Sequence, residues 1–496
     1  MKMATEIKDL QPRTLFGLFD ALLSVPRESG NEGKAREFVL DFARANGLRA
    51  HVDEVGNVIV RVEGSKGFEA CEPVVLQAHL DMVCVKSEDS THDFKKDRIP
   101  AFVDGDFIKT KGTTLGADNG IGLCAALAVA IDKDFAHPPL ELVFTIEEET
   151  GLTGASNLKP SSFAGRKLIN LDSEEEGFIY IGCAGGADAT IHLKLGEIVQ
   201  LPDYVWVKVE VGGIEADGSF GALAGGHSGL EIDKGRGNAL KILGRAIAFA
   251  TDGMDFVLGE ISGGTRKNVI PSRAFGFVYV PKSMAEDFVS KISAFEGIVR
   301  QELKYSDKPC AIRCTVGEEP SDKRASPKEL LKLLLALPHG VLGMSQALKG
   351  LVETSSNLAI VRREGDEALV VCNTRSSVAS QMEAVRLGMK ACGELAKGKV
   401  VFGGEYPPWQ PDVESPLLQV AKQVHKEVFG VEPTVTAVHA GLECAVIKAN
   451  IPDIDPISIG PNIAGAHSVK ESCSVSSVQR FYKYLKAILS YLAKST

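Results

Sequence analysis

The chain has no CxxC pair, although it contains ten cysteines among 496 residues. The cysteines are scattered, and several of them lie inside apolar runs, as Cys124 does in IGLCAALAVAI. This pattern is not that of a small disulfide-bonded scaffold. It favours buried, reduced thiols in a cytosolic protein.

The sequence also has no uninterrupted apolar stretch near the ~18 residues that a membrane-spanning helix needs. Its first 25 residues, MKMATEIKDLQPRTLFGLFDALLSV, lack a basic segment followed by an apolar block. We therefore expect neither a signal peptide nor a membrane span, and we expect a cytoplasmic location.

Positive charge is not in excess either, since 55 Lys and Arg face 65 Asp and Glu, for a formal net charge of −10. Nucleic acids and anionic membranes are therefore unfavoured as partners. Hydrophobic residues make up 44% and charged residues 24%, which is typical of a soluble globular protein. The length exceeds that of one ordinary core, so two domains are expected.

Apolar periodicity divides the chain into three stretches. Residues 1–185 alternate helical patterns with short strands, as α/β proteins do. Residues 186–398 alternate like half-exposed antiparallel strands, with helical patterns between them, and from residue 399 the α/β character returns. We predict an α/β fold: a discontinuous domain (1–185 and 399–496) with a mixed, mostly parallel sheet flanked by helices, plus an inserted α+β domain (186–398).

The individual elements follow from the same periodicity. Residues 84–111 are interpreted as a polar surface excursion, and a helix is expected directly after Asp118. The other expected helices cover residues 12–24, 32–46, 237–250, 283–300, 327–336, 378–396, 415–428, 441–448 and 475–493. The expected strands of the first stretch cover residues 49–54, 57–63, 73–79, 141–146 and 167–172.

Five acidic and histidine motifs lie in the two α/β stretches and none lies in the insert. They are LQAHLDMV, LGADNG, TIEEETG, LDSEEEG and GAHS. Four of them directly follow an apolar or β-branched run, a position where α/β proteins build their sites. Histidines together with several carboxylates form a mixed nitrogen and oxygen ligand set. Two divalent metals that share a carboxylate would suit this set, which indicates metal-assisted hydrolysis.

The first two motifs supply His79, Asp81 and Asp118. His79 and Asp81 are spaced i, i+2, so at a strand end both side chains share one face, and Asp81 could orient His79 as a metal ligand. Asp118 lies in a glycine-flanked turn before a helix, where a carboxylate could bridge two metals. Taken singly, the pair could also be a chance strand end, and Asp118 an ordinary helix cap.

The remaining motifs add acids and one more imidazole. Glu147, Glu148 and Glu149 form a run whose like charges are costly without a cation. One glutamate could bind metal while a neighbour acts as general base, and the sequence alone does not say which. Asp172 is interpreted as a terminal ligand and His467 as a second imidazole ligand. Alone, the run would fit a solvated acidic loop, and His467 a structural histidine.

The insert carries three further candidates. His227, in GGHSG, could donate a hydrogen bond to an oxyanion. Asn268, in GGTRKNVIP, could hydrogen-bond a substrate, and Arg375, at the end of VVCNTR, could bind a carboxylate through two bonds. Each of them alone is more often a turn or surface residue. In a hydrolase with a lid they would contact the substrate from the moving side.

Along almost its whole length the chain resembles the aminoacyl-histidine dipeptidases, also called peptidase D or Xaa-His dipeptidase. These belong to the co-catalytic zinc exopeptidases, which include carnosinases and aminoacylases. The motifs that carry the resemblance appear in the family's order: LQAHLDMV, GTTLGADNGIG, HPPLELVFTIEEETG, LDSEEEGFIYIGCAGG, GGHSG, VETSSN, YPPWQP, HAGLEC and GAHS. The LDSEEEG to GCAGG block and HAGLEC are specific to this subgroup.

The resemblance implies a role for each residue of the motifs. His79, Asp118 and Asp172 would hold one zinc ion, and Asp118, Glu149 and His467 the other. The family has two glutamates before a small residue and a glycine, which here matches Glu148 to Gly151. Glu148 would therefore be the general base and Asp81 would orient His79, while Glu147 is an additional acid.

The resemblance further implies a di-zinc metallopeptidase that hydrolyses dipeptides of the Xaa-His type. A hydroxide that bridges the metals would attack the peptide carbonyl, with Glu148 as general base. His227, Asn268 and Arg375 fall on the family's lid positions for oxyanion and carboxylate binding. Family members use the middle domain as an enlarged lid or for dimer contacts, so a homodimer is one expected assembly.

Four other functions compete with this prediction. A broad-specificity dipeptidase or an N-acyl-amino-acid deacylase would use the same metal chemistry on another substrate. A non-catalytic metal-binding protein would be expected to lack the base or a ligand, yet every expected position is filled. A dinuclear phosphoesterase would want more histidine ligands and more basic phosphate contacts than these motifs offer.

Overall fold

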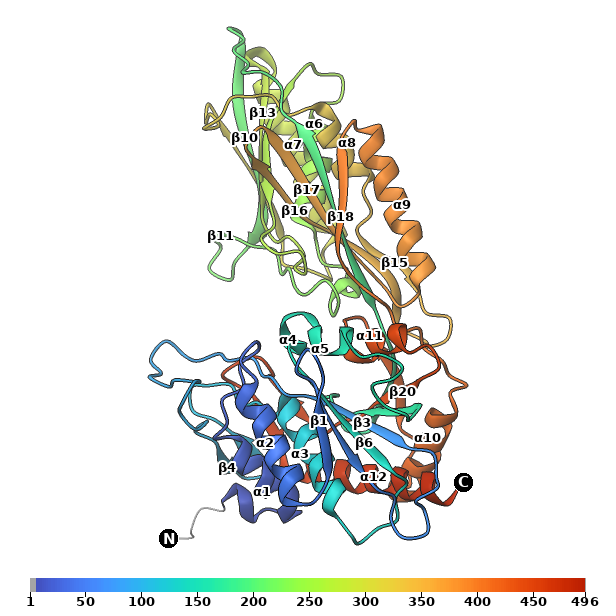
Figure 1. The fold of residues 1–496 in the computed structure, drawn as a ribbon. Helices are drawn as coiled ribbons and strands as arrows, with labels where there is room; N and C mark the ends of the chain where they lie inside the picture. The colour runs from blue at the N-terminus through green and yellow to red at the C-terminus, as the bar shows by residue number, and fades with distance from the viewer. Residues whose placement is uncertain (1–5, 496) are drawn as a thin grey trace. The chain divides into compact units, whose positions relative to one another are not determined.

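The computed structural model describes residues 6–495, which form two compact units (Figure 1). The first unit contains the chain up to Gly182, then Trp409–Ala437 and the chain from Leu442 onward. The second contains Cys183–Pro408 and Val438–Gly441. It extends past residue 398, where the sequence analysis ended the insert, because strand β18 (Lys399–Tyr406) pairs with β9 (Gly185–Lys194).

The first unit is built on a mixed eight-stranded sheet, as predicted. Strand β3 lies between β6 and β7 and runs parallel to both, and β7 runs parallel to β20, whereas β1 and β2 are antiparallel. Every residue of β3 and β6 is buried, in keeping with their mostly apolar sequences. In spatial order the strands are β1 (Arg49–Val52), β2 (Val58–Val62), β6 (Leu140–Thr145), β3 (Val74–His79), β7 (Lys167–Asn170), β20 (Asp455–Ser458), β8 (Phe178–Cys183) and β19 (Thr434–Val438).

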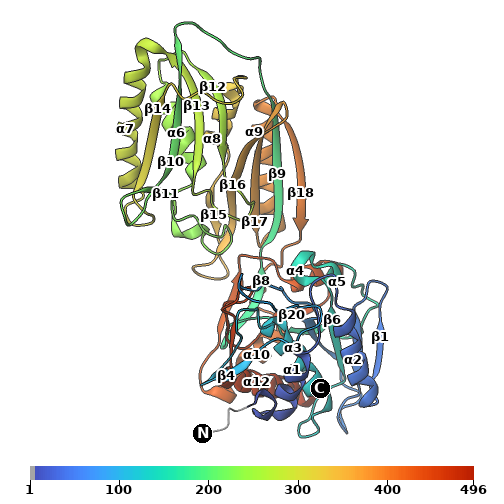
Figure 2. The same ribbon diagram turned by 90° about the vertical axis from the view of Figure 1, so that its left-hand side faces the viewer.

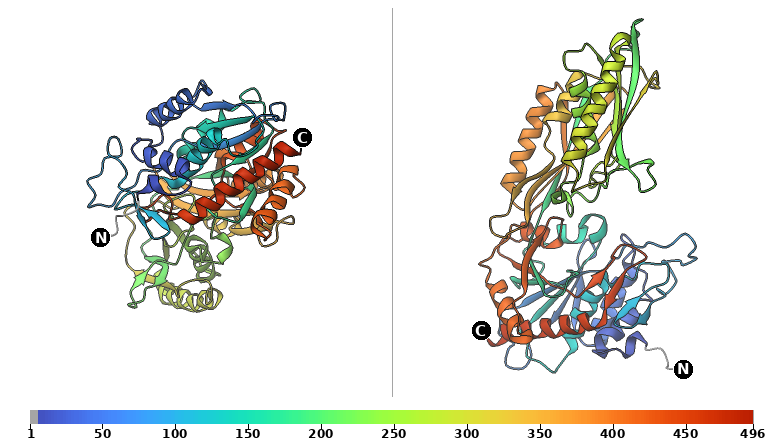
Figure 3. Two further views of the ribbon diagram at one scale, coloured as in Figure 1. Left: turned by 90° about the horizontal axis from the view of Figure 1, so that it is seen from below. Right: turned by 180° about the vertical axis from the view of Figure 1, so that it is seen from behind.

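Helices pack against this sheet in a connected layer. Within it α1 contacts α3, α3 contacts α12, and α12 contacts α10 (Figure 3). Helix α3 is apolar around its whole circumference and almost fully buried. The bounds of the helices are α1 (Arg13–Leu22), α2 (Gly33–Ala45), α3 (Ala117–Ile131), α5 (Thr153–Ser156), α10 (Pro416–Phe429), α11 (Glu443–Asn450) and α12 (Val475–Lys494).

Local signals set the ends of these helices. Ser415 caps α10 by accepting a hydrogen bond from the backbone N–H of Leu418, and Pro416 follows at the first helical position. Gly430, with a φ of +75°, ends the helix in the left-handed conformation. Each of the nine helices predicted by residue range begins and ends within two residues of its observed counterpart.

Residues 84–111 differ from the expected surface excursion, because part of this segment is regular. Strands β4 (Phe102–Asp104) and β5 (Phe107–Lys109) form a hairpin around Gly105, whose φ is +60°. Strand β5 pairs with β22 (Ser472–Ser474), which also pairs with β21 (Ile463–Ala464). The sequence did not indicate this sheet, since its two halves lie more than 350 residues apart.

The second unit is an antiparallel sheet with helices α6 (Ala239–Ala250), α7 (Ala285–Glu302), α8 (Lys328–Ala336) and α9 (Ala379–Leu395), shown in Figure 2. The core between sheet and helices is lined by buried aliphatic side chains from both. The remaining strands are β10 (Tyr204–Ile214), β11 (Phe220–Gly221), β12 (Val257–Gly263), β13 (Ala274–Pro281), β14 (Cys310–Val316), β15 (Gly340–Met344), β16 (Val352–Glu364) and β17 (Glu367–Ser376).

The cysteines and the hydropathy of the helices follow the expectations from the sequence. Within residues 6–495 no disulfide joins any of the cysteines, and six of the ten are buried. Over the same residues no helix combines the length and the apolar character that crossing a membrane requires.

Candidate dinuclear metal centre

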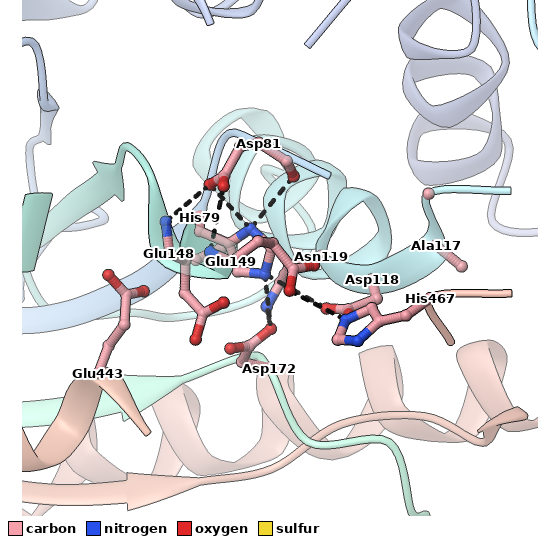
Figure 4. A network of polar contacts seen from close by, with 12 residues as sticks. His79, Asp81, Ala117, Asp118, Asn119, Glu148, Glu149, Asp172, Glu443 and His467 are labelled. Atoms are coloured by element: carbon pink, nitrogen blue, oxygen red, sulfur yellow. Dashed lines mark hydrogen bonds and ion pairs between the residues drawn. The ribbon is translucent and has the colours of Figure 1, made fainter. Parts of the chain in front are cut away.

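The candidate ligands stand where neighbouring strands of the first unit end (Figure 4). His79 is the last residue of β3, the run Glu147–Glu149 begins two residues after β6, and Asp172 lies two residues after β7. Because β3 is parallel to both neighbours, these three ends meet at one edge of the sheet.

Asp118 brings the two histidines together. Its Oδ1 lies 3.2 Å from Nε2 of His79, and its Oδ2 lies 3.0 Å from Nε2 of His467. Asp118 is in the first turn of α3 but departs from helical geometry, and its peptide bond to Asn119 is cis. His467 has a φ of +62°, a region that non-glycine residues avoid unless their surroundings hold them there. The two sides of one carboxylate thus face two imidazoles.

Three overlapping groups of side chains have the spacing of metal ligands. They are His79, Asp118 and Asp172; Asp118, Glu149 and His467; and His79, Glu148 and Glu149. Within each group the donor atoms all lie within 4.8 Å of one another. Asp118 belongs to the first two groups, so its carboxylate stands where a ligand shared by two ions would stand.

Asp81 holds both His79 and the acidic turn. Its Oδ1 lies 3.3 Å from Nδ1 of His79, and the backbone N–H groups of Glu148 and Glu149 donate to its two oxygens over 3.1 and 3.2 Å. Ser29 donates a further bond of 2.7 Å. Burial opposes the ionisation of Asp81, but these bonds outweigh it and lower its pKa to about 2. An ionised Asp81 therefore orients the imidazole of His79.

The charges of the cluster are balanced by protons. Burial raises the pKa of Glu148 well above its ordinary value and that of Asp172 to about 6. Hydrogen bonds to the carboxylates of Asp118 and Glu149 raise the pKa of His467 to about 11. Acids so close together require a positive charge, which protons on the imidazoles provide here and which divalent cations would provide in their place.

The donor set fits a pair of borderline divalent cations. Imidazole nitrogens and carboxylate oxygens are the ligands that zinc takes in catalytic sites. Oε1 of Glu149 is buried and has no hydrogen-bond partner among the described residues, so this oxygen is available to a cation. The cluster can therefore accommodate two ions, with zinc as the expected metal.

Glu147 differs from its two neighbours. It belongs to none of the three ligand-type groups within residues 6–495. Its φ is +50°, and its backbone N–H donates to Oε1 of Glu32 over 3.1 Å. The left-handed conformation at this residue turns the chain between β6 and the short helix α4 (Glu148–Gly151).

His227 lies in the second unit, in the loop after β11. Its Nδ1 accepts hydrogen bonds of 3.2 Å from the backbone N–H groups of Gly229 and Leu230. Burial, followed by the charge of Arg375, lowers the pKa of His227. The neutral imidazole therefore carries its proton on Nε2, which is free to donate.

Asn268 and Arg375 also lie in the second unit. Asn268 is exposed, and the carbonyl groups on either side of it accept bonds of 3.1 and 2.9 Å from Nδ2 of Asn357. Arg375 is only 8% exposed and donates to Oη of Tyr406 over 3.0 Å. Its Nε is buried without a partner among the described residues. A buried guanidinium of this kind suits an anionic ligand.

Glu471 is a supporting residue that the sequence analysis missed. Its carboxylate accepts hydrogen bonds from four consecutive backbone N–H groups, those of residues 115 to 118, over 2.7 to 3.4 Å. Glu471 stands four residues after His467, so it joins the segments that carry His467 and Asp118. No pattern marks it, because a glutamate in VKESCS resembles a surface residue.

Arg27 supports the same region as a hydrogen-bond donor, whereas Glu471 is an acceptor. Its buried guanidinium donates to the carbonyl oxygens of Leu80 (3.2 Å), Asp81 (2.7 Å) and Gly116. It therefore connects the segment after β3 with the segment before α3. Nothing in the local sequence distinguishes this arginine from an exposed one.

Replacing Glu471 with Gln is expected to weaken metal binding. The amide has one acceptor oxygen in place of two, and its NH₂ group would face the backbone N–H groups that the second oxygen now accepts from. We expect the free energy of unfolding to fall by about 2 kcal/mol and the affinity of the metal-free protein for zinc to fall about tenfold or more. Thermal unfolding and zinc titration measure these effects.

The matched control is Glu141→Gln, since Glu141 is a buried glutamate near the amino end of β6 that accepts from the N–H groups of Ala164 and Gly165. It should lower stability and leave zinc affinity unchanged. Equal zinc affinities for the Glu471 variant and the parent would contradict the supporting role.

Comparison with known proteins identifies the family of this chain. The sequence model of peptidase family M20/M25/M40 matches residues 75–491. The cytosol non-specific dipeptidase of Escherichia coli K12 is 38% identical over 489 residues, which cover 98% of this chain and 99% of that protein. The crystal structure of aminoacylhistidine dipeptidase from Vibrio alginolyticus shares 34% identity with a TM-score of 0.89, covering 98% of both chains.

A more distant structure, aminopeptidase PepT from Bacillus cereus, has a TM-score of 0.57 at 16% identity over 98% of this chain and 99% of that one, and shares the fold. The resemblance stated from the motifs and the predicted fold class are both confirmed. The chain belongs to peptidase family M20/M25/M40 and is a hydrolase that acts on peptide bonds.

Proposed function

We propose that this protein is a metal-dependent dipeptidase that uses two divalent cations, with zinc the expected metal, and that it prefers dipeptides of the Xaa-His type. The observation that carries the proposal is the position of Asp118, whose two oxygens lie 3.2 and 3.0 Å from the imidazoles of His79 and His467. Asp172 and Glu149 complete one ligand group each. Two relatives that match nearly the whole chain are named as dipeptidases.

In the proposed reaction the cations supply Lewis-acid activation of water and of the scissile carbonyl. Glu148 accepts a proton from the attacking water and passes it to the leaving amine. Its half-buried position beside His79 and Glu149 supports this assignment. Asp81 keeps His79 oriented, and its bonds to the N–H groups of Glu148 and Glu149 keep the acidic turn in place.

We assign substrate contacts to the three residues of the second unit. The proton on Nε2 of His227 is available to a developing oxyanion. Arg375, buried and without an acidic partner among the described residues, would bind the C-terminal carboxylate of the substrate, which restricts the enzyme to very short peptides. Asn268 would add a hydrogen bond from its exposed loop. In this proposal the second unit serves as a lid, or as the contact surface of a homodimer.

Two further aspects of the proposal come from the names of relatives. The Vibrio relative is named for aminoacylhistidine substrates, whereas the Escherichia coli relative is named as a non-specific dipeptidase of the cytosol. A broad-specificity dipeptidase is therefore the second candidate function. A cytoplasmic location is proposed on the same basis.

Replacing Glu148 with Ala is expected to lower kcat for a dipeptide by about 10²- to 10⁴-fold, because the general base is lost. Bound zinc, measured by elemental analysis, should stay at the parental level. Glu147→Gln is the matched control, since Glu147 belongs to none of the ligand-type groups in the described chain. Activity of the Glu148 variant within tenfold of the parent would exclude Glu148 as the base.

A substrate panel separates the candidate functions. We expect the highest kcat/KM for β-alanyl-histidine, lower values for Gly-Gly and Leu-Leu, and no hydrolysis of N-acetyl amino acids. Equal values for the three dipeptides would favour the broad-specificity dipeptidase. Hydrolysis of only the N-acetyl amino acids would overturn the dipeptidase proposal in favour of a deacylase.

Metal binding should depend on pH. In the metal-free protein the pKa of His467 is raised to about 11, so the imidazole is protonated near neutral pH and a metal must displace that proton. Affinity should therefore rise with pH, by up to about tenfold per pH unit for each proton displaced. Zinc titrations between pH 6 and 8, with a pH indicator to follow proton release, measure this. An affinity that does not change over this range would contradict the prediction.

A further inference from the structure

Glu443 is a buried acid for which the proposed reaction has no role. It begins α11, belongs to the HAGLEC motif, and its side chain is fully inaccessible to solvent. One of its oxygens, Oε2, accepts hydrogen bonds from Nε2 of Gln77 (2.5 Å) and from Oγ1 of Thr145 (2.9 Å). The other, Oε1, is buried without a partner among the described residues.

The two partners of Glu443 belong to a longer polar network inside the sheet. Nε2 of Gln77 lies 3.1 Å from Oγ1 of Thr145, and Oε1 of Gln77 accepts from Nδ2 of Asn170 over 2.6 Å. Asn170 in turn accepts a hydrogen bond from the hydroxyl of Ser458. The network therefore crosses the four neighbouring strands β6, β3, β7 and β20.

The position of this network relates it to the candidate metal centre. Gln77 precedes His79 by two residues and Asn170 precedes Asp172 by two. In a strand, residues i and i+2 point to the same face. In Figure 4 Glu443 lies near Glu148, on the side of the cluster away from His467. The network thus involves residues that closely precede two of the candidate ligands along the chain.

Its cost argues that it is more than packing. Each buried polar group that loses its partner destabilises the fold, whereas well-packed apolar side chains could fill the same space without this cost.

We propose that Glu443 is a positioning residue, which through its hydrogen bonds to Gln77 and Thr145 keeps the ends of β3 and β6 in the relative position that metal binding requires. This inference rests on the proposed function, because it assumes that the cluster binds metal. Glu443 acts through Gln77 on His79, and through Thr145 on the acidic turn that follows β6.

Zinc titration and the visible absorption of the Co²⁺-substituted protein test the proposal, since the Co²⁺ spectrum reports ligand geometry. Glu443→Ala removes both hydrogen bonds and should lower zinc affinity by about 10- to 100-fold and change the Co²⁺ spectrum. Glu443→Gln keeps an oxygen that can accept from Gln77 and Thr145. It should bind zinc within about threefold of the parent, with a parental Co²⁺ spectrum.

Glu141→Ala is the matched control, because Glu141 is a buried glutamate near the opposite end of β6. It should lower the melting temperature without changing zinc affinity or the Co²⁺ spectrum. Thr145→Val, which removes only one donor to Glu443, gives the same test if Glu443→Ala does not fold. It should weaken zinc binding in the same direction.

Two results would overturn the proposal. One is a folded Glu443→Ala or Thr145→Val protein with parental zinc affinity and Co²⁺ spectrum. The other is a Glu443→Gln protein as weak in zinc binding as Glu443→Ala, since hydrogen bonding would then not be what matters. Failure of the proposed function is separable, because a parent protein that binds metal but cleaves no dipeptide would refute that function and leave the metal comparison valid.

Discussion

The whole arrangement depends on the need to neutralise several acids in one buried place. Asp118, Glu148, Glu149 and Asp172 meet at the end of a sheet, where burial raises the pKa values of Glu148 and Asp172. In the metal-free protein, protons on two histidines supply part of this balance. His467 keeps its proton at pH values far above its ordinary pKa. Acids this close together are stabilised by positive charge, which divalent cations bound at the cluster would supply in the proposed function.

Groups that are not themselves candidate ligands hold the ligands in place. Asp81 satisfies two backbone N–H groups of the acidic turn, and Glu471 satisfies four at the start of α3. Arg27 satisfies carbonyl groups of two segments. Buried backbone groups must find partners, so these charged side chains replace the hydrogen bonds that regular structure would otherwise provide. Irregular segments can therefore present ligands at angles that a helix or strand would not allow.

The second unit follows a different physical plan. Its antiparallel sheet buries one face under four helices, and its candidate substrate residues occupy loops or the end of a strand. His227 has its tautomer set by two backbone N–H groups, and Arg375 is buried with Tyr406 as its hydrogen-bond partner. Nε of Arg375, which has no partner within residues 6–495, is suited to bind a ligand because a side chain already held in place needs little reorganisation.

The sequence by itself determined the periodic and local features of this protein. Helix bounds, the α/β class and the order of the motifs could be predicted, since each depends on neighbouring residues. The convergence of His79, Asp118 and His467 was expected from the position of the two histidines after apolar runs, from that of Asp118 before a helix and from the family resemblance, not from spacing alone. Only the tertiary structure revealed the hydrogen bonds of Glu471, Arg27 and Glu443, and the pairing of β5 with β22. Their partners lie far away along the chain, and a side chain's hydrogen bonds are decided by what the fold places beside it, which no local pattern encodes.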